Sequence, residues 1–153
     1  MQMIGERRTA IARIGIVLVV MLMVGFLAPK HADAATYSDR YMASLINGAR
    51  RAHGRAPLKF NDSLSKFARR HSSTMASADR LYHNPYLAQW LRNWSWRILG
   101  ENVGVGDSVP SLHVAFMNSR HHRDNILDRR FSSIGVGVVV RNGRTWVTVI
   151  FRG

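Results

Sequence analysis

The strongest constraint on the fold is a pair of apolar runs near the end of this chain of 153 residues. Ile134–Val140 and Thr145–Phe151 are rich in β-branched residues, and Asn142-Gly143 lies between them. Asn-Gly between two such runs is typical of a β-hairpin closed by a tight turn. Because neither run alternates strictly with polar residues, both strands are expected to be covered on both faces. The hairpin therefore predicts an α+β domain in which helices pack against a sheet.

The first 34 residues have the pattern of a secretory leader. Basic residues precede an apolar run over 14–28, and Ala32 and Ala34 place small side chains at the two positions that signal peptidase reads. The run is shorter than the roughly 20 residues that span a bilayer. We predict a signal peptide over 1–34, cleaved near Ala34, and a secreted or extracellular domain over 35–153. An uncleaved anchor that tethers the same domain outside the membrane is the alternative.

The predicted mature domain is strongly basic. The chain has 22 Lys and Arg, 9 Asp and Glu and no Cys. Without residues 1–34 it keeps 18 basic and 7 acidic side chains, a formal charge of +11. The arginines are scattered, with no basic stripe interleaved with aromatic residues, so nucleic acid is not the expected partner. An anionic envelope lipid or glycan fits an exported basic protein better, and an arginine-rich proteome is the neutral explanation.

Three helices are expected before the hairpin. The first begins at Ser38, a candidate N-cap, and ends at Gly54. The second begins at Asn61 or the following residue and frays near Asp79. The third is capped by Asp107-Ser108. The glycine-rich stretch between the second and third helices favours a short strand or loop.

Three features within these segments have competing interpretations. Arg50 lies one turn from Asn47 on the first helix, and we expect no more than a surface contact. His71 falls on the buried stripe of the second helix, where a core-edge histidine bonded to a backbone carbonyl is favoured over a catalytic one. Tyr86–Trp96 contains three tryptophans, and a lid over the core is favoured over an aromatic ligand groove.

Candidate site residues come from three separated segments. His83 precedes Asn84-Pro85, where proline forces the chain out of helical geometry and displays the histidine at a bend. Glu101 is the only glutamate after the leader. His122 lies in Phe116–Leu127, a polar stretch between two apolar runs that needs partners in a fold. We predict that the three segments meet at one cleft.

Short motifs through the domain carry a family resemblance. In chain order they are Leu45-Ile46-Asn47 with Arg50, Ala68-x-x-His71-Ser72, His83-Asn84, Gly100-Glu101-Asn102-Val103, Asn118-Ser119-x-x-His122-Arg123-x-Asn125-Ile126-Leu127 and Ile134-Gly135-Val136-Gly137. Together they resemble a bacterial member of the CAP superfamily, which comprises the cysteine-rich secretory proteins, antigen 5 and the pathogenesis-related proteins. The resemblance covers about residues 40–153. It implies a three-layer α-β-α sandwich of the CAP/SCP type.

The resemblance also implies a cleft cluster of two histidines and two acidic residues. His83, His122 and Glu101 match three of these four members. Ser119 stands where the second acid is looked for, and Phe116 replaces the more usual tryptophan. The cluster therefore keeps three of the four residues, and the serine weakens a catalytic interpretation.

Two interpretations of this cluster stay open. Family members bind a divalent metal in some cases, and His83, Glu101 and His122 would suit zinc or a similar ion. Without a metal, Glu101 would hold one of the histidines by a hydrogen bond. Asn84 and Asn102, next to these residues, are further candidate binding residues.

The predicted function is a secreted, non-catalytic binding module with a His/Glu cleft. The alternative is a divalent-metal-dependent hydrolase of peptide or cell-wall material that uses the same cleft. A serine hydrolase built on Ser119 and His122 is disfavoured because no nucleophile elbow surrounds the serine. The expected partner is an anionic envelope lipid or glycan, or a small hydrophobic ligand, bound by a monomer.

Overall fold

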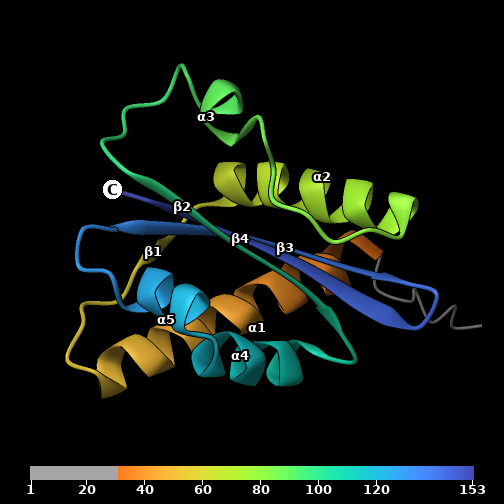
Figure 1. The fold of residues 1–153 in the computed structure, drawn as a ribbon, viewed down its shortest axis with the longest axis horizontal. Coiled ribbons are helices and arrows are strands. Elements are labelled where there is room, and N and C mark those ends of the chain that lie inside the picture. The colour runs from red at the N-terminus through yellow and green to blue at the C-terminus, as the bar shows by residue number, and fades with distance from the viewer. Residues whose placement is uncertain (1–30) are drawn as a thin grey trace, which may run out of the picture.

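The computed structural model describes residues 31–153, so most of the predicted leader lies outside the described residues. Its elements, in chain order, are α1 (His31–Ala52), β1 (Lys59–Phe60), α2 (Asp62–Ala78), α3 (Leu87–Trp90), β2 (Leu99–Gly106), α4 (Val109–Asn118), α5 (Arg120–Leu127), β3 (Ser133–Arg141) and β4 (Arg144–Arg152). Figure 1 shows three layers, with the sheet between α2 on one side and α1, α4 and α5 on the other. The predicted α-β-α sandwich is confirmed. None of the described helices has the length and apolar character needed to cross a membrane.

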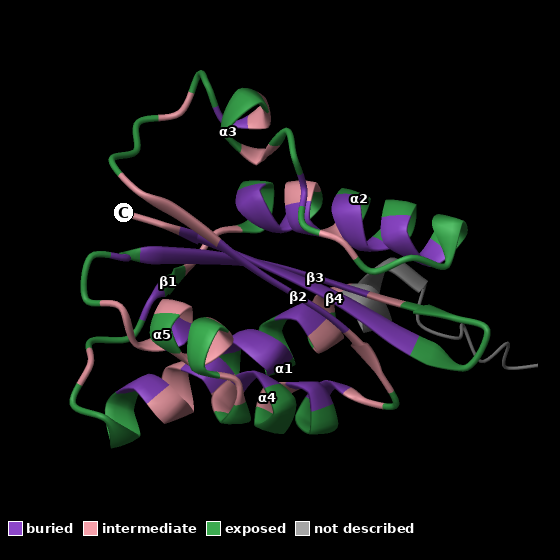
Figure 2. Ribbon diagram, in the orientation of Figure 1, coloured by how far each residue is buried: buried purple, intermediate pink, exposed green. Residues whose placement is uncertain are grey.

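The hairpin forms the centre of a four-stranded sheet. Its strand order is β1-β3-β4-β2, with β4 antiparallel to both neighbours and β1 parallel to β3. Asn142 and Gly143 both have positive φ, 51° and 70°, as the tight turn requires. Figure 2 shows β3 and β4 buried along most of their length, as expected for strands covered on both faces.

Local capping signals set the boundaries of two helices. The Oδ1 atom of Asn61 accepts a hydrogen bond from the Leu64 amide at 2.8 Å and begins α2. Asp79, in the left-handed region at φ 45°, ends it. The Ser108 side chain accepts from the Ser111 amide and begins α4. These predicted positions are confirmed.

The predicted start of α1 is wrong. Ser38 lies inside the helix, which begins at His31. The upstream residues include three alanines, which favour the helix and allow it to extend past the serine. Cleavage after Ala34 would shorten α1 at its first turn, and that boundary stays a prediction.

Arg50 is not the surface residue that we expected. It is 1% exposed, and its Nη1 donates to the carbonyls of Ile126 and Asp128 at 2.7 and 2.9 Å. Its Nε donates to the Ala56 carbonyl at 2.8 Å. Burial lowers the pKa of the guanidinium, against the charge of Asp128, which raises it. The side chain therefore ties the end of α1 to the end of α5.

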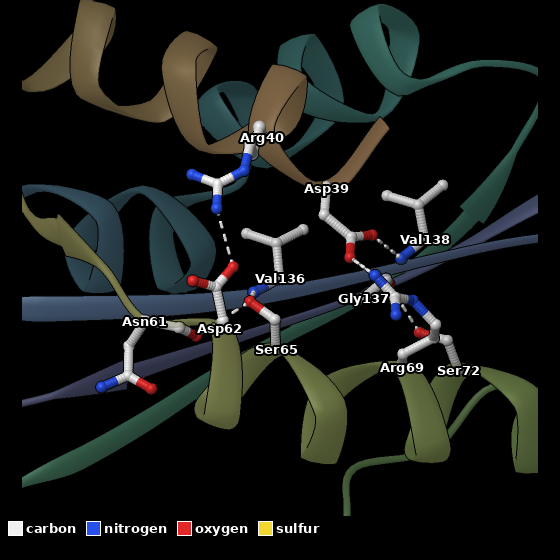
Figure 3. Close-up of polar contacts among 10 residues, drawn as sticks. All are labelled: Asp39, Arg40, Asn61, Asp62, Ser65, Arg69, Ser72, Val136, Gly137 and Val138. Carbon is white, nitrogen blue, oxygen red and sulfur yellow. Dashed lines mark hydrogen bonds and ion pairs between the residues drawn. The ribbon is translucent and has the colours of Figure 1, made fainter. Parts of the chain in front are cut away.

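Side chains from both helical layers cover the free edge of β3. Because β1 is only two residues long, the rest of β3 has no strand on this side. The Val136 amide donates to Ser65 Oγ at 3.0 Å, and the Val138 amide donates to Asp39 Oδ1 at 2.7 Å (Figure 3). Asp39, on α1, is fully buried and also pairs with Arg69 of α2. An edge satisfied in this way cannot pair with another chain.

Candidate functional site

Glu101 holds His83 in place. The carboxylate projects from β2 and its side chain is 5% exposed, whereas the His83 side chain is 64% exposed. Glu101 Oε2 lies 2.9 Å from His83 Nδ1 and accepts a hydrogen bond from the Asn84 amide at 2.9 Å. Pro85 keeps Asn84 out of the helical region, so this amide is free to donate. The geometry leaves the Nε2 atom of His83 directed away from this bond.

The second oxygen of Glu101 has no such partner. Oε1 is buried and makes no hydrogen bond within the described residues. A buried acceptor without a donor is costly, on the order of 1–3 kcal/mol, and more when it is charged. A ligand N–H, a ligand hydroxyl or a cation at this oxygen would remove that cost. The carboxylate therefore has one oxygen that positions His83 and one buried oxygen without a hydrogen-bond partner.

Two asparagines join α5, which carries His122, to β2. The Asn102 side chain is fully buried and donates to the His122 carbonyl at 3.0 Å. Asn125 donates to Asn102 Oδ1 at 2.9 Å and to the Glu101 carbonyl at 3.2 Å. Asn102 thus contacts the backbone of the site. Asn125 anchors α5 to β2.

The His122 ring is half-buried against Phe116. The ring centroids are 5.0 Å apart and the planes are tilted by 56°. Burial lowers the pKa of His122, and the charges of His83 and His121 lower it further. An imidazole with a lowered pKa is neutral at physiological pH and can accept a hydrogen bond or bind a metal.

A histidine titration followed by NMR tests this arrangement. We expect His122 to titrate below the ordinary histidine pKa of about 6.5. His83→Ala should raise its midpoint, because the substitution removes a neighbouring positive charge. His53→Ala is the control, since His53 lies at the end of α1 and bonds the Ala49 carbonyl. An unchanged midpoint in His83→Ala would show that the two imidazoles do not interact.

The membership of Ser119 in the cluster stays a prediction. The residue lies at the junction of α4 and α5, and its amide donates to the Ala115 carbonyl. Its hydroxyl makes no hydrogen bond within the described residues, so no Ser119–His122 dyad is formed. Those residues also contain no preformed group of three His, Asp or Glu side chains around a metal position. The predicted cleft and metal binding by His83, Glu101 and His122 stay predictions.

The segment after His83 has two roles. Trp90 and Trp94 pack on Phe67 with ring centroids 6.2 and 6.0 Å apart, so the predicted lid over the core is confirmed. His71 is 2% exposed and bonds the Tyr82 carbonyl at 2.8 Å, the core-edge role that we favoured. The same segment also lines a pocket over α2, which the sequence interpretation placed second to the lid.

Comparison with known proteins identifies the family. Residues 43–151 match the family model described as CAP, the cysteine-rich secretory protein family. The chain belongs to the CAP family. The matched region extends from α1 to the end of β4 and contains every residue of the predicted cluster.

Three bacterial proteins illustrate the similarity of this CAP chain to known proteins. The uncharacterized protein YkwD of Bacillus subtilis is 34% identical over 115 residues, which is 71% of this chain and 44% of that protein. An extracellular protein with an SCP domain from Bacillus anthracis is 26% identical, with a TM-score of 0.69 over 84% of this chain and 44% of that structure. An outer surface protein of Borrelia burgdorferi, 17% identical, shares the fold with a TM-score of 0.67 over 74% of this chain and 90% of that one. The chain thus spans less than half of the first two relatives.

Proposed function

We propose that this CAP chain is a secreted, non-catalytic binding module that acts at the cell envelope and receives a ligand group at His83, Glu101 and His122. The observation that carries the proposal is the divided role of Glu101. One of its oxygens holds His83 and the Asn84 amide, while the buried Oε1 has no donor. A ligand that donates a hydrogen bond to Oε1 would complete the site.

Further observations support a binding role and a location at the envelope. Within the described residues the Ser119 hydroxyl makes no hydrogen bond with His122, so these residues do not present a serine nucleophile paired with this base. The SCP-domain relative from Bacillus anthracis is an extracellular protein, and the sequence of this chain begins with a predicted leader. The excess of basic side chains suits an anionic lipid or glycan as the partner.

The alternative is a divalent-metal-dependent hydrolase, and the same orphan oxygen favours it. His83 Nε2, the His122 ring and Glu101 Oε1 are the nitrogen and oxygen donors that zinc prefers. The donor types therefore suit such an ion, and the three side chains would have to move together to bind it, because no such group is preformed in the described residues. A bound metal would supply Lewis-acid activation of water. The contribution of the chain itself is the Glu101–His83 hydrogen bond, which fixes the orientation of the imidazole.

Cosedimentation tests the proposal. Purified protein is mixed with phosphatidylglycerol vesicles or with isolated cell-wall polymer, in low salt and in about 0.5 M salt, where simple charge attraction is screened. We expect retention on at least one of these at both salt levels. Glu101→Gln should weaken it about ten-fold, since glutamine has one acceptor oxygen and replaces the other with an NH2 donor. Arg51→Gln, at an exposed position at the end of α1, is the charge control.

Elemental analysis and a product assay separate the two functions. Protein purified without chelator is analysed for zinc and other divalent metals beside Glu101→Ala, and wall polymer and peptides are assayed for newly released ends. We expect no release with or without added zinc. Release that requires both the metal and Glu101 would establish the hydrolase instead. If the protein sediments with neither the vesicles nor the wall polymer, the proposed binding module is refuted.

A further inference from the structure

We propose that a groove on the outer side of α2 binds a saccharide that carries a carboxylate. This inference rests on the proposed function, because it names the chemistry of the envelope ligand. It places that ligand beside the His83–Glu101 pair in a separate set of residues. The groove, called here the α2 groove, consists of two adjoining hollows between α2 and the segment that contains α3. Figure 1 shows α3 on the side of α2 that faces away from the sheet.

The first hollow has a volume of about 370 Å³ and a mixed lining. It is lined by Arg70, His71, Thr74, Tyr82, Asn84, Pro85, Tyr86 and Trp90. Three aromatic rings and a proline provide flat apolar walls, and Arg70 and Asn84 provide donors. Ligand pockets in proteins have this composition, with a few placed polar groups among apolar walls, and volumes from about 300 Å³ upward.

The second hollow continues the first past a stacked pair of side chains. It has a volume of about 290 Å³ and is lined by Phe67, Arg70, Gln89, Trp90, Arg92 and Asn93. The Arg70 guanidinium lies over the Trp90 ring, 4.9 Å from its centroid, and both residues line both hollows. Two hollows in series suit a ligand made of linked units rather than one compact molecule.

Asn84 supplies the independent sign of a ligand. The residue is 8% exposed, and its Oδ1 accepts a hydrogen bond from the Tyr86 amide at 2.9 Å. This bond fixes the orientation of the side-chain amide, so Nδ2 must be the free end. Nδ2 is buried and has no partner within the described residues. A buried donor without an acceptor is costly, and a ligand oxygen in the first hollow would satisfy it.

The charge and shape of the groove select among ligands. A sugar ring has apolar C–H faces that lie against aromatic rings and many oxygen acceptors for the Asn84 donor. Its hydroxyl groups can also donate to Thr74 Oγ1, whose own hydrogen is donated to the Arg70 carbonyl. No acidic side chain lines either hollow in the described structure, whereas Arg70 and Arg92 do, so a carboxylate on the sugar is favoured. A lipid tail would contact the rings but would leave the Asn84 donor unsatisfied. The observations therefore favour an acidic saccharide over a lipid.

Calorimetry with three defined oligosaccharides tests the inference. Hyaluronan tetrasaccharide carries carboxylates and acetamido groups, chitotetraose carries only acetamido groups, and maltotetraose carries neither. We expect the hyaluronan fragment to bind at least about ten-fold more tightly than the other two, less so as salt is raised. Tyr86→Ala should weaken it about ten-fold by removing an aromatic wall. Arg70→Gln should remove the preference for the acidic sugar.

Matched controls come from the opposite layer. Tyr37 is a 72% exposed tyrosine on α1, and Arg51 is an exposed arginine at the end of the same helix. Tyr37→Ala and Arg51→Gln should leave the affinity unchanged within about two-fold, as for most surface substitutions. Equal affinity for all three sugars, or full affinity in Tyr86→Ala, would overturn the inference.

The assay also separates this inference from the proposed function. If binding to vesicles rather than to any sugar is lost in Tyr86→Ala, the groove binds lipid and the saccharide assignment is wrong. If wall or vesicle binding depends on Glu101 but not on Tyr86 or Arg70, the inference fails and the proposed function stands. If vesicles, wall polymer and oligosaccharides all fail to bind, both are refuted.

Discussion

Gly137→Ala is expected to lower the free energy of unfolding by more than about 4 kcal/mol. A Cβ atom at this position of β3 would overlap the backbone of Ala68 and Arg69 in α2. Backbone atoms of a helix cannot turn aside as a side chain can, so α2 would have to move away from the sheet. The core between them contains Leu64 and Ile150, both fully buried, and would open to water.

Thermal unfolding followed by circular dichroism measures this effect. A loss of that size should lower the Tm by roughly 15 °C in a domain of this length. Gly48→Ala is the control: it makes the same substitution in the interior of α1, where an added Cβ would have nothing within 4 Å. There we expect a gain of about 0.5–1 kcal/mol, because alanine favours the helix. A Gly137→Ala protein as stable as the wild type would show that α2 does not approach β3 so closely.

The parts of the fold that the sequence predicted depend on local signals. Asn142-Gly143 determines the turn through its own backbone preferences, and Asn61 and Ser108 begin helices by bonding amides three residues further on. Such interactions can be read from a window of a few residues. The middle layer came from the family resemblance. The two residues of β1 are too few to produce a recognisable pattern.

The surroundings of Arg50 and Ser119 could not be predicted from the residues near them in the sequence. The carbonyls that Arg50 contacts belong to Ile126 and Asp128, 76 and 78 residues away, so no nearby signal marks its burial. Ser119 has the right sequence spacing from His122, yet a junction between two helices leaves its hydroxyl unbonded. Spacing in the motif therefore did not produce a hydrogen bond, in agreement with the disfavoured serine hydrolase.

The Glu101–His83 pair was predicted from the sequence, but the free donor of the neighbouring Asn84 was not. The resemblance placed His83 with Glu101, and the structure brings them to 2.9 Å. The free donor of Asn84 depends on a hydrogen bond between its other amide atom and the Tyr86 backbone, which composition cannot reveal. The sequence signal for this pocket was the aromatic segment after Pro85. The same segment can cover the core and line a pocket.

Asp39 is a buried acid whose pKa lies well above the ordinary value. It is fully buried, and burial raises its pKa from 3.8 to about 6, although the Val138 amide and Arg69 both act to lower it. The free-energy cost of removing the ionised carboxylate from water exceeds the stabilisation that these two partners give it. Asp39 therefore connects α1, β3 and α2 (Figure 3) while its ionised form carries a penalty.

Asp39→Asn tests that balance through pH. An acid with a raised pKa in the folded state binds a proton more tightly there than when unfolded, so its contribution to stability is complete below pH 3.8 and is lost as the pH rises through about 6. Asparagine keeps an acceptor for the Val138 amide but does not titrate. We therefore expect the stability of Asp39→Asn relative to wild type to rise by about 2–3 kcal/mol between about pH 4 and pH 7.

Urea denaturation of both proteins at a series of pH values measures this difference, in which the shared titratable groups cancel. Any cost of placing an amide N–H against Arg69 is independent of pH and shifts the whole curve without changing its slope. Arg69 is about one-third exposed, so its guanidinium can turn to water when the carboxylate is replaced. A difference that falls as the pH rises would mean that Asp39 ionises readily in the fold. In that case the attraction of Arg69 and the Val138 amide, rather than burial, would control this connection between the layers.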